Sequence, residues 1–397
     1  MSTQNGYFLI ADITGYTQYL SESELDHAQQ ILTNLLNLLI RHTRPPLIIS
    51  RLAGDAVISY GLSDSFLQGQ TFAEMLEDTY VSFRRTVELM VRNTTCSCNA
   101  CRNIQSLDLK FFVHYGEFGV QKLDAHDELV GSDVNLLHRL LKNHVTEETG
   151  MRAYTLFTDA AIQKLGLGDA LPALLRHEES YEHLGTVLTW VEDMHPVWEA
   201  KRLSVQVRVT PEQELMRVST EIALPPERVW DLMLQPAHFN VLTGGQRIEI
   251  EQRSKGRVGV GSVYQCYHGD GTVLPQTILT WQPFERVVIQ FEVPMPIRGI
   301  SMTMELRLEP TPEGVRFSEI YAKSSGPYLG RLMADAMVRK MRGKFREDVA
   351  RFRAHAEGLD AARPPLAPPA LPESAVSAAA LSSLSPAPAT AASHTAH

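Results

Sequence analysis

Residues 46–60 read Pro-Leu-Ile-Ile-Ser-Arg-Leu-Ala-Gly-Asp-Ala-Val-Ile-Ser-Tyr. Two runs of β-branched and apolar residues flank the short Leu-Ala-Gly-Asp turn, and this pattern predicts an antiparallel hairpin. Asp55 lies at the tip of the hairpin, where an exposed, rigidly held carboxylate suits a metal ligand. Asp is also a common turn residue, so this position taken alone is more simply explained by the turn.

A second carboxylate ends the strand that we predict over Tyr7–Asp12. The chain then passes through Ile13-Thr-Gly-Tyr-Thr17 into a helix that opens near Ser21. A strand-to-helix turn with a glycine points backbone amides outward, which suits a phosphate group. Two carboxylates at adjacent strand ends could hold two divalent metals on a triphosphate.

The order of the predicted elements defines the fold of this part of the chain. Apolar periodicity predicts helices over 25–40 and 72–91, and alternation predicts a strand over 107–115. With the first strand and the hairpin, the order is β-α-β-β-α-β, which is the ferredoxin-like pattern of helices on one face of an antiparallel sheet. Many unrelated functions share this pattern, so it does not decide the activity.

Four short motifs resemble, in order and spacing, those of class III nucleotidyl cyclase domains. They are Ala11-Asp-Ile-Thr-Gly-Tyr-Thr17, Arg51-Leu-Ala-Gly-Asp55, His114-Tyr-Gly116 and Val134-Asn-Leu-Leu-His-Arg139. The resemblance covers roughly residues 5–195. It implies that Asp12, Ile13 and Asp55 hold two Mg²⁺ or Mn²⁺ ions per site, and that Thr14 and Gly15 contact the nucleotide.

Asn135 and Arg139 lie four positions apart on a helix predicted over 133–142, so they share one helix face. The resemblance implies that they are catalytic, with Arg139 on the phosphate and Asn135 orienting the ribose. The fork of donors of an arginine can follow charge that moves between phosphate oxygens. Taken alone, such a pair is more simply an ordinary solvated helix face.

Arg51 and Glu128 occupy the positions at which adenylyl cyclases carry Lys and Asp for base recognition. The charge signs match, although both side chains differ in shape from those of the family. Guanylyl cyclases carry Glu at the position of Arg51, so the resemblance favours ATP over GTP. Simple surface charge is the alternative for both residues.

The resemblance also implies a two-fold homodimer with two shared sites. In this arrangement Asp12 and Asp55 come from one chain. The residues that complete the site come from the other: Arg51, Glu128, Asn135 and Arg139.

Three cysteines cluster between the second helix and the strand that follows it: Cys96, Cys98 and Cys101. Thiols so close together suit a soft metal such as zinc, with a fourth ligand from His114, Cys266 or the other subunit. The Cys98-x-x-Cys101 spacing also allows a redox pair, and three ordinary surface cysteines are the third possibility.

A second domain is predicted over 213–357, after a linker over 201–212. Its pattern is a strand, a helix opened by Pro226-Glu-Arg-Val-Trp230, six strands and a long final helix over about 329–354. This order resembles the START-like, polyketide cyclase (SRPBCC) superfamily, and it implies a helix-grip fold with a pocket for a small hydrophobic ligand. We expect an apolar stripe of the last helix to line the pocket, with core packing as the alternative. The stripe consists of Met333, Met337, Met341, Phe345, Val349 and Phe352.

Composition bounds the remaining possibilities. A formal net charge of −9 argues against nucleic acid as a partner. From the lack of a basic and then apolar opening stretch we expect no signal peptide, and no apolar run approaches the ~18 residues of a transmembrane segment, so we expect a cytoplasmic protein. Residues 358–397 are rich in Ala, Pro and Ser, and this composition predicts a disordered tail.

The sequence therefore predicts an α+β protein, with a ferredoxin-like cyclase domain over 1–200, a helix-grip START-like domain and a tail. The leading hypothesis is conversion of ATP to cyclic AMP and pyrophosphate under control of a small molecule in the second domain. The first alternative is a non-catalytic nucleotide-binding or dimerisation module coupled to a hydrophobic-ligand sensor. It is favoured by the lack of triphosphate-binding lysines near 181–187. The second alternative is a START-like domain that acts on a polyketide-like or lipid substrate.

Overall fold

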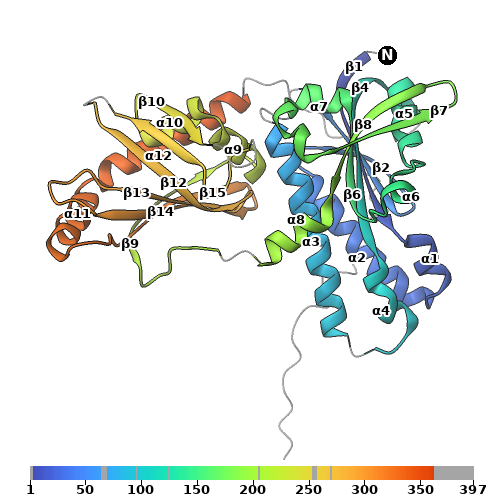
Figure 1. Cartoon of the computed structure of the whole chain (residues 1–397), viewed down its shortest axis with the longest axis horizontal. Helices are drawn as coiled ribbons and strands as arrows, with labels where there is room; N and C mark the ends of the chain where they lie inside the picture. Colours follow the sequence, from blue (N-terminus) through green and yellow to red (C-terminus); the bar gives the residue numbers. More distant parts are fainter. Residues whose placement is uncertain are drawn as a thin grey trace, which may run out of the picture.

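The structure is a computed structural model that describes residues 3–63, 69–94, 96–123, 126–203, 206–252, 257–268 and 271–361. These residues form two sheets that lie side by side, with helices α3 (Gly69–Asn93) and α8 (Met194–Leu203) on the side of the first sheet that faces the second (Figure 1). The predicted tail begins inside a helix that extends to Ala361, and residues 362–397 lie outside the described residues.

The first sheet has the strand order β2-β3-β1-β4-β6-β8-β7, and β5 pairs with β4. Its strands are β1 (Thr3–Thr14), β2 (Ile48–Ala53), β3 (Ala56–Leu62), β4 (Asp108–Leu123), β5 (His126–Val130), β6 (Tyr154–Thr158), β7 (Leu175–Tyr181) and β8 (Gly185–Asp193). All pairs are antiparallel except β4 with β6. The order β2-β3-β1-β4 confirms the predicted ferredoxin-like arrangement and the α+β class.

Alternation along β1 divides the core of the first domain between the two faces of the sheet. Tyr7 and Leu9 pack on one face with helices α2 (Leu25–Thr43) and α3. Phe8 and Ile10 pack on the other face with helix α5 (Ser132–Leu140). The remaining helices of this domain are α1 (Tyr16–Ser21), α4 (Asn99–Asn103), α6 (Val145–Thr149) and α7 (Asp159–Leu165), with short 3₁₀ turns η1 (Ile104–Ser106) and η2 (Gly168–Ala173).

The fourth strand is longer than the sequence indicates. We predict a strand over 107–115, whereas β4 continues to Leu123. The extension exists because Gly119–Leu123 pair with β5, so the hydrogen bonds of the extra residues are satisfied.

The second sheet has the order β10-β11-β12-β13-β14-β15-β9 and is antiparallel throughout. Its strands are β9 (Glu214–Ile222), β10 (Arg247–Gln252), β11 (Val263–Tyr267), β12 (Val273–Gln282), β13 (Arg286–Glu292), β14 (Ser301–Thr311) and β15 (Gly314–Ala322). Its helices are α9 (Pro226–Leu234), α10 (Pro236–Thr243), α11 (Tyr328–Lys340) and α12 (Arg342–Ala361). Pro226 opens α9 in its first turn, as predicted.

The single long final helix that we predict is divided into α11 and α12. The division falls at Met341, whose backbone N–H bonds to the carbonyls of both Met337 and Val338, so the last turn of α11 tightens. Gly343, the second residue of α12, also weakens the helix near this point. α12 packs into the core of the second domain through Phe352.

A buried polar network joins the two domains. The Glu74 carboxylate on α3 accepts hydrogen bonds from Gln70 Nε2 (2.8 Å), Trp230 Nε1 (2.8 Å) and Trp281 Nε1 (2.6 Å). Thr71 Oγ1 also donates to Asp231 on α9, at 2.6 Å. Both tryptophans belong to the second domain, so the Glu74 carboxylate links the two domains. All three of these hydrogen-bond donors belong to the same chain.

None of the helices in the described ranges is both long and apolar enough to cross a membrane.

Candidate functional site

The structure brings the two predicted metal-binding carboxylates to neighbouring strand ends. Asp12 is near the end of β1, and its register partner on β3 is Ala56, next to Asp55. A hydrogen bond of 3.2 Å from Ile13 N to the Asp55 carbonyl fastens the hairpin tip to β1. The short hairpin and the strand pairing together therefore place two carboxylates at one end of the sheet.

Electrostatics distinguish this pair from ordinary surface acids. Burial raises the pKa of Asp12 to about 6, and the Asp55 carboxylate adds to the shift while Lys110 opposes it. Burial also raises the pKa of Asp55. Among the described residues, the Asp12 carboxylate receives no side-chain hydrogen bond. An incoming cation would relieve both the burial cost and the mutual repulsion.

Lys110 is a site residue that the sequence analysis missed. It lies opposite Asp12 in the β1–β4 ladder. Its Nζ donates to Thr146 Oγ1 at 3.1 Å and lies 4.9 Å from the centre of the Tyr154 ring. Burial lowers its pKa, and Asp12 opposes that shift. Its position two residues after Asp108, directly before the apolar run Phe111–Val113, is the only local signal of this lysine.

The turn after β1 has the backbone conformation that its glycine allows. Gly15 has a φ of 86°, in the left-handed region, and directly precedes α1. A Cβ at this position would lie 3.1 Å from the Ser106 carbonyl oxygen, so the turn also packs closely against η1. Thr14 Oγ1 donates to the Arg152 carbonyl at 3.3 Å.

Arg51 and Glu128 lie in direct contact. The Arg51 guanidinium bonds to the Glu128 carboxylate, and its Nη2 lies 3.1 Å from His138 Nε2. Burial, and then Arg51, lower the pKa of His138. Because the Arg51 and Glu128 side chains are 46% and 42% exposed, the ion pair itself contributes little stability and remains accessible to a ligand. The sequence analysis paired the two charges but missed His138.

The His114-Tyr-Gly116 motif fixes the start of α5. Asp133 Oδ2 accepts the Glu117 backbone N–H at 2.6 Å, and Asp133 Oδ1 lies 3.4 Å from His114 Nε2. A Cβ on Gly116 would lie 2.3 Å from Asp133 Oδ2, so the glycine makes room for this contact. The motif therefore anchors the first turn of α5.

Both predicted catalytic residues project from α5. Asn135 and Arg139 are exposed, whereas Val134 and Leu137 of the same helix pack against the sheet. Neither Asn135 nor Arg139 makes a side-chain hydrogen bond or ion pair with another described residue. Their functional groups are therefore available to an external partner.

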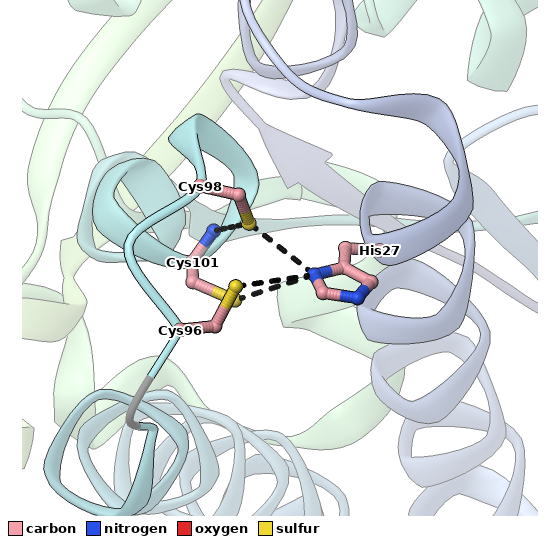
Figure 2. Close-up of side chains that lie close together, drawn as sticks. All are labelled: His27, Cys96, Cys98 and Cys101. Carbon is pink, nitrogen blue, oxygen red and sulfur yellow. Dashed lines mark hydrogen bonds between the residues drawn. The ribbon is translucent and has the colours of Figure 1, made fainter.

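The three cysteines meet a histidine that the sequence analysis did not consider. His27, near the start of α2, lies with Cys96, Cys98 and Cys101, and the four possible ligand atoms are within 4.8 Å of one another (Figure 2). The suggested fourth ligands lie elsewhere.

His114 is buried in β4, where its Nδ1 lies 2.8 Å from Thr158 Oγ1. Cys266 is buried in the second domain beside Thr243. Both are therefore wrong as ligands from the same chain.

The second domain encloses a cavity of about 510 Å³. Its walls are mainly apolar and include Met337, Met341 and Phe345 of the predicted stripe. Met333, earlier in α11, is 43% exposed and does not line the cavity.

Buried acceptors also line the cavity. Glu319 is 3% exposed, and burial raises its pKa to about 8, with the Asp348 carboxylate adding to the shift. Glu319 Oε2 and Gln276 Oε1 are buried without a hydrogen-bond partner in the described part of the chain. The cavity therefore offers acceptor atoms to a ligand within apolar walls.

Two family models match this chain. Residues 213–357 match the model described as "Polyketide cyclase / dehydrase and lipid transport", which confirms the prediction of a polyketide cyclase-like second domain. Residues 32–149 match a model described as a protein of unknown function.

Known proteins and structures are similar to parts of the chain. An uncharacterized protein of Mycobacterium tuberculosis is 35% identical over 107 residues, which span 27% of this chain and 43% of that protein. A bacterial light-regulated adenylyl cyclase is 11% identical with a TM-score of 0.37, over 51% of this chain and 57% of that chain. The guanylyl cyclase Cya2 is 14% identical with a TM-score of 0.36, over 48% and 92%.

Proposed function

We propose that the first domain is a nucleotidyl cyclase that converts ATP to cyclic AMP and pyrophosphate. The observation that carries this proposal is the carboxylate pair of Asp12 and Asp55, which lies beside a glycine turn and opposite Lys110. Carboxylates, a lysine and outward backbone amides are the groups that a metal-bound triphosphate requires.

The donor set fits hard divalent cations. Mg²⁺ and Mn²⁺ prefer oxygen ligands, and this site offers two carboxylates whose pKa values are raised mainly by burial. The backbone of Ile13 completes the proposed ligand set. When bound, such ions lower the pKa of a hydroxyl nucleophile and neutralise phosphate charge.

The other residues of the chain bind and orient the nucleotide. Lys110 is placed to meet phosphate oxygens beside Asp12, which offsets the lack of lysines near 181–187. Arg139 stabilises charge that develops around the α-phosphate, and Asn135 orients the ribose. In our proposal these two side chains come from α5 of a second copy of the chain, because neither has a hydrogen-bond or ion-pair partner among the described residues.

Base recognition falls to the accessible cluster of Arg51, Glu128 and His138. Both charged groups are already oriented by their mutual contact. Adenine presents a donor from its amino group and an acceptor ring nitrogen, which match a carboxylate and a guanidinium. We therefore propose ATP as the substrate.

The second domain would sense a small molecule. We infer that its ligand has an apolar body and at least one hydrogen-bond donor, such as a hydroxyl or an amine. The unpartnered Glu319 Oε2 in a cavity with mainly apolar walls supports this inference, because a bound donor would satisfy it. It modifies the prediction of a purely hydrophobic ligand.

A non-catalytic nucleotide-binding module is the second candidate. The exposure of Asn135 and Arg139 favours it, since no described residue of the chain holds these side chains against the carboxylate pair.

Product analysis separates the two candidates. Purified full-length protein is incubated with Mn²⁺ and each of the four common nucleoside triphosphates, and cyclic product is measured. We expect cyclic AMP from ATP, lost in Asp12→Asn and retained in the control Asp169→Asn, whose exposed carboxylate lies outside the site. No cyclic product from any nucleotide would overturn the catalytic proposal.

A further inference from the structure

The thiol cluster has the donor set and the dimensions of a zinc site. His27 Nδ1 lies 3.2 Å from Cys98 Sγ, 3.6 Å from Cys96 Sγ and 3.8 Å from Cys101 Sγ. In tetrahedral zinc the ligand atoms are about 3.5 Å apart between nitrogen and sulfur, as follows from metal–ligand lengths of about 2.0 Å and 2.3 Å. The observed separations therefore leave room for one ion at the centre.

We propose that His27, Cys96, Cys98 and Cys101 bind one Zn²⁺ ion in a closed structural site. Three thiolates and one imidazole form a standard tetrahedral set for zinc, and the site has no open position for a substrate. Soft sulfur ligands disfavour Mg²⁺ and Ca²⁺, which prefer oxygen. The site is separate from the Asp12 and Asp55 pair, so it does not depend on the proposed cyclase activity.

Local hydrogen bonds hold the cysteine loop in a conformation that suits metal binding. Cys98 is the N-cap of α4, and its sulfur accepts the Cys101 backbone N–H at 3.4 Å, so the two thiols are turned to the same side. Glu24 Oε2 accepts the Ala100 N–H at 3.0 Å, and Tyr19 OH donates to the Ala100 carbonyl at 3.0 Å. These two bonds hold α4 against α1 and the start of α2, where His27 lies.

A redox pair explains the arrangement less well. A disulfide between Cys98 and Cys101 would use two of the thiols and leave Cys96 and His27 without a role. All three cysteines are free in the structure, and each sulfur approaches the same imidazole nitrogen (Figure 2). A metal shared by four ligands requires their ligand atoms to lie close together, as these three sulfurs and the imidazole nitrogen do.

The ion would connect segments far apart in the sequence. His27 and Cys96 are separated by 69 positions, and the site would fasten the start of α2 to the connection between α3 and β4. A cross-link over such a long loop restricts the unfolded chain and thereby stabilises the fold. Removal of the metal should therefore lower the melting temperature.

Metal analysis tests the proposal directly. Full-length protein is purified without a histidine tag or chelators, and zinc per chain is measured by mass spectrometry. We expect about one zinc per chain in the unaltered protein and in the control Cys266→Ser. In His27→Ala and Cys98→Ser, zinc affinity should fall by more than the roughly 10–100-fold that loss of an outer-shell partner costs.

His27→Cys distinguishes ligation from a general effect on folding. A fourth thiolate can replace the imidazole, so this variant should retain one zinc and the melting temperature of the unaltered protein. Cobalt-substituted protein should show sulfur-to-metal charge transfer and tetrahedral visible bands, and these bands should differ between the unaltered protein and the His27→Cys variant. Zinc well below one per chain after reconstitution with all thiols reduced, or unchanged affinity in His27→Ala, would overturn the proposal.

Discussion

Glu74 and Asp12 are both carboxylates that burial perturbs, but they differ in what surrounds them. Burial raises the pKa of Glu74 to about 7 and that of Asp12 to about 6. Glu74 accepts three hydrogen bonds from its own chain. Asp12 faces a second carboxylate and receives no side-chain hydrogen bond within the described ranges. A raised pKa therefore reports burial, whereas the lack of internal partners indicates a binding site.

The largest expected effects concern catalysis at the Asp12 and Asp55 pair. Asp12→Ala removes a metal ligand, and Arg139→Ala removes a group that stabilises the transition state. Each should lower the rate of cyclic AMP formation by ~10²-fold or more. Product formation by each purified variant measures this.

Mixing the two variants tests whether sites are shared between subunits. In a mixed dimer one site carries both changes and the other carries neither, so activity should return after subunit exchange. If both variants are inactive and the mixture stays inactive despite demonstrated exchange, a shared site is excluded.

The next effect concerns the contribution of the buried Glu74 carboxylate to stability. Glu74→Ala leaves the N–H groups of the buried Trp230 and the half-buried Trp281 unpaired, which should lower the free energy of unfolding by about 2 kcal/mol or more. Glu74→Gln keeps one acceptor oxygen and should cost less. Denaturant titration measures both, and equal stability of all three proteins would contradict the network.

Glu74 also predicts a pH dependence of a definite sign. Between its ordinary pKa of 4.5 and about 7, the folded protein holds a proton that the unfolded chain has released. The free energy of unfolding should therefore fall as the pH rises through this window. Glu74→Gln lacks this proton, so its stability should fall less steeply, and an identical slope in both proteins would contradict the assignment.

A smaller effect is expected in the cavity of the second domain. Glu319→Gln replaces a carboxyl group that can ionise and pair with a bound amine, so affinity for an amine ligand from a thermal-shift screen should fall about 10-fold or more. Met333→Ala is the matched control, since Met333 does not line the cavity. Equal affinity in both variants would place the ligand elsewhere.

The smallest expected effect is coupling between the domains. The Glu74 network joins α3 to the second domain, so a saturating cavity ligand should change nucleotide affinity about 5-fold or more. Thr71→Val removes the hydrogen bond to Asp231 and should weaken this coupling. If the ligand leaves nucleotide affinity unchanged, the network is structural only.

Local patterns in the sequence were sufficient to predict the hairpin and the carboxylate pair. The Gly-Asp turn sets the hairpin, and antiparallel pairing of two apolar strands then fixes the positions of Asp12 and Asp55. The ferredoxin-like order followed for the same reason, since each element has a clear period of its own.

Residues that depend on distant contacts could not be predicted in this way. His27 reaches the thiols only because α2 and α4 pack together, and no local pattern marks it as a ligand. The position of Lys110 opposite Asp12 cannot be known until the register of β4 with β1 is known. The division at Met341 depends on two backbone hydrogen bonds that leave no signal in helical periodicity.

Mn²⁺ binding in the presence of a non-reactive ATP analogue tests the central claim most directly. It compares the Asp12 and Asp55 pair with the hydrogen-bonded Glu74 in one experiment. Calorimetric titration of zinc-loaded protein should detect nucleotide-dependent Mn²⁺ binding that is lost in Asp12→Asn and Asp55→Asn and retained in Glu74→Gln. The affinity should decrease as the pH falls through about 6, since protonated Asp12 cannot bind the ion. Equal Mn²⁺ affinity in Asp12→Asn and the unaltered protein, or no Mn²⁺ binding by the unaltered protein, would contradict the account.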